Sequence, residues 1–181
     1  MNTSRKQSPT LQKLQSRIGI ILLAVITIWT ASRLWQGSLL GTGTPAPGWN
    51  LKVADERGNF LSLDELKGHV VVLDFWSTTC PPCIREIDEL NALTAEHRDK
   101  PLRIVGITAG GETMEEVLAF KTRKNVGYPL VLDDGSVSNA YKVQSLPTVY
   151  ILDKEGKIVF ANRGFVDGAT LRNTVGLLLD L

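Results

Sequence analysis

Residues 70–86 read VVVLDFWSTTCPPCIRE, and this stretch decides the fold. It opens with an apolar run, Val70–Phe75, that is typical of a buried parallel strand and is interrupted only by Asp74. Cys80 and Cys83 follow where the strand pattern gives way to helical periodicity. Two cysteines at such a junction can close a short disulfide, hold a metal ion as two thiolates, or be inert residues of the core.

The spacing of the two cysteines favours thiol–disulfide exchange. A loop this short adds little stability by restricting the unfolded chain, because that benefit grows with loop length. Cys80 should begin the helix, where the macrodipole and the free N–H groups stabilise a thiolate, and Pro81 suits its first turn. Cys83 lies one turn further along and should be more buried. We therefore expect Cys80 to be the attacking nucleophile and Cys83 the resolving thiol.

The remaining chain from residue 49 onward alternates between strand and helix patterns. Apolar runs bounded by turn residues predict six further strands, at 49–54, 60–63, 102–108, 130–132, 148–152 and 158–160. Helical spacing predicts helices near 80–97, 113–124, 137–141 and 169–179. The alternation predicts an α/β layer fold on a mixed sheet.

Length and composition exclude several classes of protein. The 181 residues suit one domain, and a hydrophobic content of 43% can bury a core, which excludes a disordered chain. A net charge of +1 provides no electrostatic footprint for nucleic acid. Two cysteines exclude a disulfide-dense scaffold and a four-cysteine zinc site. No nicotinamide, flavin or haem motif is present, so we expect neither a cofactor nor a metal.

The charges are distributed unevenly along the chain. Of the 20 bases, six precede Asp55, where there is no acid, and the other 14 stand with all 19 acids from Asp55 onward. The apolar run that begins at Ile18 and extends to Trp35 would measure roughly 27 Å as a helix, close to a hydrocarbon core of about 30 Å. We expect residues 18–35 to be an uncleaved transmembrane signal-anchor, with a cleaved signal peptide as the alternative.

The flanking charges predict the orientation of this segment. Four bases precede it and Arg33 lies at its other end, so the positive-inside rule leaves a basic leader, 1–17, in the cytoplasm and the body in the periplasm. Residues 36–48 are rich in Gly, Ser, Thr and Pro, and we expect a flexible linker there. The folded domain should then span 49–181.

The ordered set of motifs resembles the thioredoxin superfamily, and most closely its membrane-anchored, extracytoplasmic TlpA/ResA-like branch. FWSTTCPPC follows a VVVLD strand, and SLPT at 145–148 comes about 65 residues after Cys80. Pro45–Pro47 leads into the first predicted hairpin, and the segment around 128–141 is similar to the central strand–helix insertion of that branch. The resemblance covers 46–181 and implies a thioredoxin fold with an N-terminal β-hairpin.

The resemblance also implies roles for particular residues. Leu146–Pro147 should be a cis bond that faces the disulfide and contacts substrate polypeptide. Asp74 stands where thioredoxins have a buried carboxylate, whose raised pKa would suit proton exchange with Cys83, although a partly solvated aspartate is the alternative. Glu86 matches a glutamate with a proposed acid–base role, although a solvated helix position is the alternative. Trp76 belongs either to the substrate surface or to the core.

The function implied is that of an extracytoplasmic thiol–disulfide oxidoreductase. Neither proline between the cysteines has an N–H to stabilise the Cys80 thiolate, which favours a reductant. The resemblance suggests disulfides of exported proteins as substrates, apocytochrome c or its assembly factors among them, and a DsbD/CcdA-type membrane protein as electron donor. Two alternatives stay open. One is a peroxiredoxin-like peroxidase, although its motif has Thr where Ser77 stands. The other is a copper-binding thiol module, although this sequence has no Met or His near the two cysteines.

Overall fold

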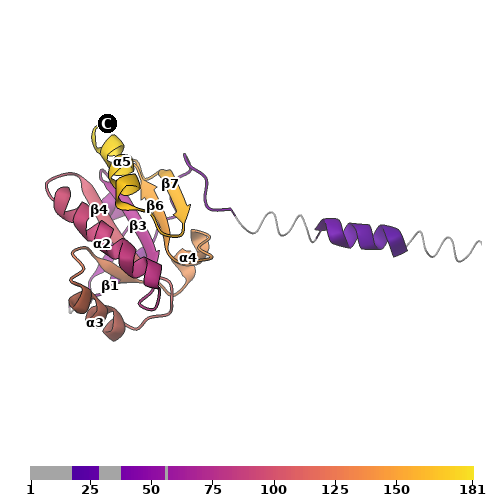
Figure 1. Cartoon of the computed structure of the whole chain (residues 1–181), viewed down its shortest axis with the longest axis horizontal. Helices are drawn as coiled ribbons and strands as arrows, with labels where there is room; N and C mark the ends of the chain where they lie inside the picture. The colour runs from indigo at the N-terminus through magenta and orange to yellow at the C-terminus, as the bar shows by residue number, and fades with distance from the viewer. Residues whose placement is uncertain (1–17, 29–37, 56) are drawn as a thin grey trace, which may run out of the picture. The chain divides into compact units, whose positions relative to one another are not determined.

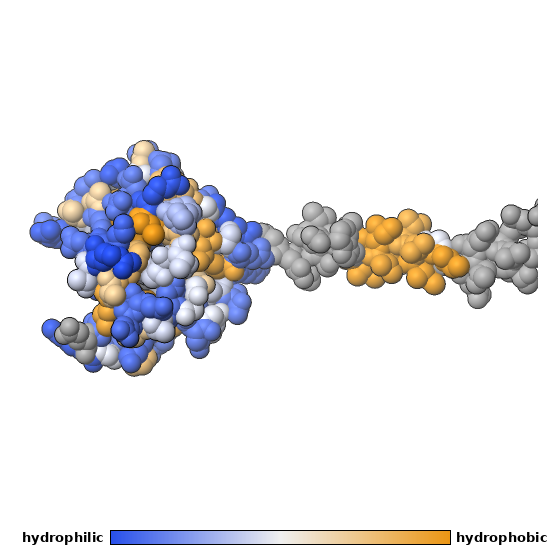
Figure 2. Space-filling model, turned by 60° about the horizontal axis from the view of Figure 1, so that its bottom comes forward, coloured by the Kyte–Doolittle hydropathy of each residue, from blue (hydrophilic) through white to orange (hydrophobic). Residues whose placement is uncertain are grey.

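The structure is a computed structural model that describes residues 18–28, 38–55 and 57–181. Residues 18–28 are helical, and their large apolar side chains are exposed (Figure 2). Among the residues that the structure describes, no helix is both long enough and apolar enough to cross a membrane. The predicted leader, 1–17, and residues 29–35 of the predicted anchor lie outside the described residues.

A second unit, Leu39–Leu181, is compact by itself and is built on a seven-stranded sheet. The strands stand in the order β2-β1-β5-β4-β3-β6-β7. Their bounds are β1 Asn50–Val53, β2 Phe60–Ser62, β3 Val70–Trp76, β4 Leu102–Thr108, β5 Leu130–Leu132, β6 Thr148–Leu152 and β7 Ile158–Arg163. β3, β4 and β5 are parallel to one another, whereas β6 and β7 continue the sheet antiparallel on one side and β1 and β2 on the other. This is the mixed sheet of a thioredoxin-like α/β fold, as predicted.

Helices cover both faces of the sheet (Figure 1). α2 (Pro81–Glu96), α3 (Met114–Lys124) and α5 (Gly168–Leu179) pack on one face, which we call the α2 face. The short helix α4 (Ser136–Ala140) and a 3₁₀ turn, η1 (Asp64–Leu66), pack on the opposite α4 face. All four predicted helices are thus present, and β5 with α4 forms the predicted strand–helix segment.

The sequence of β3 builds both cores at once. All seven of its residues are buried, and successive side chains point to opposite faces of the sheet. Val72 and Trp76 therefore belong to the cluster under α2, whereas Leu73 and Phe75 belong to the cluster on the α4 face. Asp74 lies between Val72 and Trp76 in this alternation, so its side chain points to the α2 face.

The segment 39–48 is packed onto the domain, which differs from the flexible linker expected over 36–48. Gly43 N donates to Ile158 O at 2.7 Å, Ile158 N donates to Thr44 O at 2.9 Å, and Ala46 N donates to Gly156 O at 3.0 Å. Leu39 and Leu40 also pack against the core of the α4 face. The compact unit therefore begins at Leu39, ten residues before the expected boundary at 49.

Candidate active site

The two cysteines lie at the start of α2 and are joined as a disulfide, with their Cα atoms 5.3 Å apart. Cys80 is the N-cap residue of the helix. Because Pro81 and Pro82 have no N–H, the first free donor of the helix belongs to Cys83, and it donates to Cys80 Sγ at 3.3 Å. Cys80 is half-buried and Cys83 is fully buried, so an incoming sulfur can reach Cys80 first.

The Leu146–Pro147 peptide bond is cis and lies at the same end of the sheet. Thr148, the next residue, pairs in register with Phe75 near the end of β3, which leads into the cysteine loop. Leu146 is half-buried, and the Pro147 carbonyl accepts a hydrogen bond from Gly164 N at 2.8 Å. The sheet register therefore brings the cis-proline segment beside the loop that carries Cys80.

Two carboxyl groups are buried on the same face of the sheet as Cys83. Asp74 and Glu86 both have no exposed surface, so neither of the solvated alternatives fits. Glu86 lies one helical turn after Cys83, and its Oε1 accepts a hydrogen bond from Val166 N at 2.5 Å. Both oxygens of Asp74 and Oε2 of Glu86 have no hydrogen-bond partner among the described residues.

Burial changes the acidity of both groups. Desolvation raises the pKa of Asp74 well above its ordinary value, and the charge of Glu86 raises it further. Desolvation also raises the pKa of Glu86 to about 7, although the hydrogen bond from Val166 N lowers it. Glu86 can therefore take up and release a proton near neutral pH, and Asp74 holds its proton to a higher pH than an ordinary aspartate, on the face of the sheet where Cys83 is buried.

Trp76 is in the core. Its side chain has no exposed surface, and its ring centroid is 4.7 Å from that of Phe120 in α3. A side chain at Gly106 would place a Cβ 3.0 Å from Trp76 Nε1, so the indole occupies the space that this glycine leaves. The structure thus favours the packing role and does not bring Trp76 to a substrate surface.

Two residues near the site carry no signal in the sequence. Glu112 accepts hydrogen bonds from Thr78 N at 2.8 Å and from Gly110 N at 3.1 Å, and so braces the loop before Cys80. Phe165 is 39% exposed in the loop between β7 and α5. The hydrogen bond between Thr78 N and Glu112 joins segments 34 residues apart, which local spacing cannot indicate.

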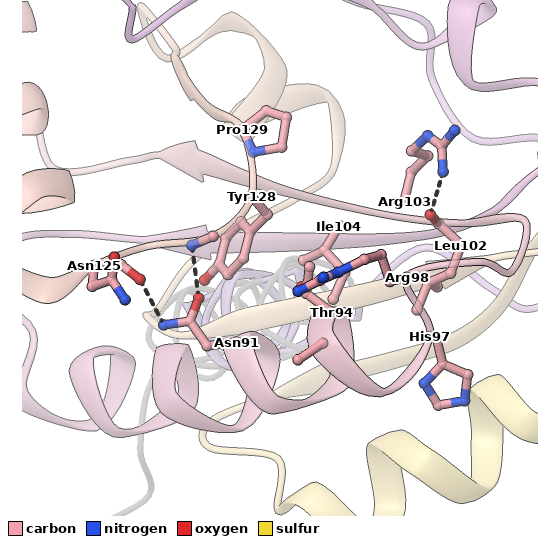
Figure 3. Close-up of a pocket in the computed structure, with 12 residues that line it drawn as sticks. Asn91, Thr94, His97, Arg98, Leu102, Arg103, Ile104, Asn125, Tyr128 and Pro129 are labelled. Carbon is pink, nitrogen blue, oxygen red and sulfur yellow. Dashed lines mark hydrogen bonds between the residues drawn. The ribbon is translucent and has the colours of Figure 1, made fainter.

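A hollow beside α2 involves none of the predicted site residues. A cavity of about 520 Å³ lies between the second half of α2, β4 and the loop before β5 (Figure 3). Asn91 crosses part of it, because its Nδ2 donates to Asn125 O at 3.3 Å and its Oδ1 accepts from Gly127 N at 2.8 Å.

Within the described part of the chain, no group of three His, Cys, Asp or Glu side chains could hold a metal ion.

Residues 42–161, two thirds of the chain, match the model of the AhpC/TSA family. The chain belongs to the AhpC/TSA family. Among relatives, it is 33% identical to the thioredoxin-like protein YneN of Bacillus subtilis over 152 residues, which cover 82% of this chain and 88% of YneN. It is 31% identical to the thiol-disulfide oxidoreductase ResA of Bacillus subtilis over 172 residues, covering 92% and 94% of the two chains.

The fold of this AhpC/TSA family member is also similar to a solved structure of the same class as ResA. The thioredoxin domain of a thiol-disulfide oxidoreductase from Bacteroides vulgatus has a TM-score of 0.68 and 28% identity, covering 77% of this chain and 99% of that domain. The thioredoxin-like fold and the paired cysteines fit the same class. This member of the AhpC/TSA family is a thiol–disulfide oxidoreductase.

Proposed function

We propose that the protein reduces disulfides of exported polypeptides outside the cytoplasm, through the Cys80–Cys83 pair. The observation that carries this proposal is the difference in burial between the two cysteines. Cys80 is half-buried and Cys83 is fully buried, and two buried carboxyl groups lie on the same face of the sheet as Cys83. Cys80, Cys83 and the carboxyl pair each have a distinct task in a two-step exchange.

The first step uses Cys80. In the reduced protein, the Cys80 thiolate attacks one sulfur of a client disulfide, and a new bond forms between Cys80 Sγ and that sulfur. The other client sulfur leaves as a thiolate with the electron pair of the broken bond. The hydrogen bond from Cys83 N supports the thiolate character of Cys80.

The second step uses Cys83 and the buried carboxyl groups. The Cys83 thiol gives its proton to the Asp74–Glu86 pair, and the resulting thiolate attacks Cys80 Sγ. The bond between Cys80 and the client breaks, the second client thiolate leaves, and the Cys80–Cys83 disulfide remains. Two electrons have moved to the client, so a protein dithiol must restore them; we place a DsbD/CcdA-type membrane protein in that role.

The donors at the start of α2 support the reducing direction. Pro81 and Pro82 offer no N–H, so the backbone donor that reaches Cys80 Sγ is that of Cys83. Strong oxidants are those whose reduced form is stabilised. A thiolate with so few donors gives a less oxidising disulfide, as a reductant requires.

The location rests on the sequence before the domain. The charge asymmetry and the apolar run support a leader at 1–17 in the cytoplasm, an anchor at 18–35 and a periplasmic domain. Its clients would then be exported proteins, and the resemblance to the TlpA/ResA-like branch supports apocytochrome c or its assembly factors among them.

The midpoint potential of the Cys80–Cys83 couple tests the direction. We expect a thiol-buffer titration of the full chain to give a value near or below about −250 mV, the range of thioredoxin-like reductants. A value of about −120 to −180 mV would instead match oxidants and isomerases and would overturn the direction. Cys83→Ser is the control, because it cannot form the internal disulfide. A wild-type chain with no reversible couple would contradict the exchange mechanism itself.

A further inference from the structure

Tyr128 lies on the α2 face just before β5, with only 3% of its surface exposed. Its hydroxyl has no hydrogen-bond partner among the described residues, and a buried hydroxyl without a partner costs stability. Within the described part of the chain, the buried side-chain oxygens that lack a partner belong to Tyr128, Asp74 and Glu86. The unpartnered hydroxyl therefore shares its face of the sheet with the two carboxyl groups that serve Cys83.

The sheet register brings Tyr128 toward this carboxyl pair. Asp74 in β3 pairs with Gly106 in β4, and Gly106 pairs with Leu130 in β5. Tyr128 is two residues before Leu130, and the side chains of both lie on the α2 face. Gly106 leaves the space between them open, because a Cβ at that position would lie 2.5 Å from Leu130 Cδ2 and 3.0 Å from Trp76 Nε1. Side chains from both neighbouring strands therefore meet above β4.

The charges of the carboxyl pair act on the Tyr128 hydroxyl. Desolvation raises the pKa of this hydroxyl well above its ordinary value, and the charges of Asp74, Glu86 and Asp88 raise it further. The hydroxyl is therefore neutral at physiological pH and lies within electrostatic reach of both members of the pair. A neutral hydroxyl accepts on its oxygen and donates its own proton, so it can pass a proton on without becoming charged.

Tyr128 also lines the hollow of about 520 Å³ beside α2 (Figure 3). Arg98 and Asn125 in its lining are exposed, so the hollow is open to solvent. Its charged residues are Arg98 and Arg103, with His97 beside them, and none of the described residues that line it is acidic. A polar hollow of this size holds water, and no carboxylate there competes for a proton. Tyr128 thus stands between solvent and the buried pair.

The exchange reaction needs a proton route at this point. Cys83, Asp74 and Glu86 have no exposed surface, so a proton that Cys83 gives to the pair cannot pass directly to solvent. The pair can accept a proton from Cys83 only while it has lost one of its own. Its protonation must therefore equilibrate with the solvent between one exchange and the next.

We propose that the Tyr128 hydroxyl, together with the water of the hollow beside α2, is the route by which the Asp74–Glu86 pair exchanges protons with solvent. The proton of the pair moves to the hydroxyl oxygen of Tyr128 while the hydroxyl proton moves to water in the hollow, and the tyrosine stays neutral. The same moves run in reverse when Cys83 regains a proton on reduction of the disulfide. Tyr128 acts through the pair and does not touch the reacting sulfurs. This inference rests on the proposed exchange and adds the route that resets its carboxyl pair.

A dependence on the starting pH tests this route. The reduced full chain is equilibrated at pH 6 or at pH 8, and stopped-flow mixing brings both samples to pH 8 with an excess of a cysteine peptide blocked as a mixed disulfide with thionitrobenzoate. Cys80 attacks the peptide sulfur and thionitrobenzoate leaves; Cys83 then attacks Cys80 Sγ and the peptide leaves as a thiolate. With a pKa of about 7, Glu86 is mostly protonated at the lower starting pH and mostly ionised at the higher one. Acid quenching gives the rate of peptide release.

We expect the wild-type protein to release the peptide at the same rate from both starting pH values, because the pair loses its proton before Cys83 reacts. Tyr128→Phe keeps the ring and removes the hydroxyl, so release should be at least about tenfold slower from pH 6 than from pH 8, since a positioned proton-transfer group contributes about 10²- to 10⁴-fold. Thr94→Leu places a larger apolar side chain in the hollow and should give the same dependence. Tyr141→Phe is the matched control, because it removes a buried tyrosine hydroxyl from the α4 face.

The ratio of the two release rates separates the route from a structural role. A loss of packing in Tyr128→Phe would slow release equally from both starting pH values, and a ratio of one in this variant would overturn the proposal. A dependence on starting pH of the same size in the wild type and in Tyr141→Phe would overturn it as well. If the wild-type protein released no thionitrobenzoate, the proposed exchange itself would fail; normal exchange with no dependence on Tyr128 would refute the proton route alone.

Discussion

The two faces of the central sheet bury their polar groups in opposite ways. On the α4 face, the Tyr150 hydroxyl donates to Tyr141 O at 2.6 Å and the Tyr141 hydroxyl donates to Pro47 O at 2.8 Å. On the α2 face, both oxygens of Asp74 and the hydroxyl of Tyr128 have no partner among the described residues. The α4 face also leaves Trp49 Nε1 unpartnered, but that group does not titrate in the physiological range.

The polar groups of the α4 face therefore contribute to folding, whereas those of the α2 face serve the exchange reaction. A satisfied buried hydroxyl contributes to folding, whereas an unsatisfied buried carboxyl costs stability and shifts its pKa toward neutrality. The unsatisfied carboxyl groups lie on the α2 face, where Cys83 is buried. The α4 face packs the sheet against the N-terminal segment. Substitutions on the α2 face should therefore change the exchange rate or the pH dependence of stability, whereas substitutions on the α4 face should change stability equally at all pH values.

Asp74→Asn should produce the largest effect, which is on exchange. An amide cannot accept the Cys83 proton, so the second step should slow by about 10²- to 10³-fold, the typical contribution of a positioned general base. A cysteine peptide blocked as a mixed disulfide with thionitrobenzoate reports both steps. The lifetime of the mixed disulfide between Cys80 and this peptide, after a single turnover at pH 7.5, measures the second step. The first step, followed by release of thionitrobenzoate, should keep its rate. An unchanged lifetime would show that the α2 face does not supply the base through Asp74.

Glu86→Gln should stabilise the oxidised protein, and more so at high pH. The pKa of Glu86 rises from 4.5 to about 7 on folding, so between these values the folded state binds more protons than the unfolded state. Stability then falls as pH rises through this window, by about 3 kcal/mol over the full shift. Urea unfolding at pH 5 and pH 8 should show the advantage of the variant growing by about 2–3 kcal/mol. A pH-independent advantage would mean that Glu86 titrates normally.

Tyr150→Phe should have the smallest effect, and only on stability. The variant loses the hydrogen bond to Tyr141 O and the one accepted from Leu40 N at 3.3 Å. The expected cost is about 1–2 kcal/mol, equal at pH 5 and pH 8. The same urea titrations measure it, and the mixed-disulfide lifetime should stay within twofold of the wild type. A longer lifetime in this variant would break the division between the two faces.

The sequence predicts the centre of the site better than its surroundings. The apolar run of β3, the prolines after Cys80 and the spacing of α2 are local signals, and each element lies within one or two residues of its expected place. The burial of Glu86 is not a local signal. Helical spacing places it on the face of Cys83, but what covers it is Val166, 80 residues further along the chain.

The same limit explains the linker. Gly, Ser, Thr and Pro between 36 and 48 favour an open chain, and nothing nearby shows that Ile158 and Gly156 offer hydrogen bonds to this segment. Trp76 illustrates the converse, because its place next to the cysteine loop suggests a surface, whereas the alternation of β3 sends its side chain inward against Phe120.

The packing of Leu39 and Leu40 onto the α4 face has a consequence for engineering. The natural junction for a gene fusion is before Leu39, because every hydrogen bond between the N-terminal segment and the domain described above begins after it. A chimera that carries a foreign export signal joined at this point should deliver the redox domain with its α4 face closed. Joining the same signal at Trp49 would remove the Pro47 carbonyl from the Tyr141 hydroxyl and leave the tyrosine pair open to solvent.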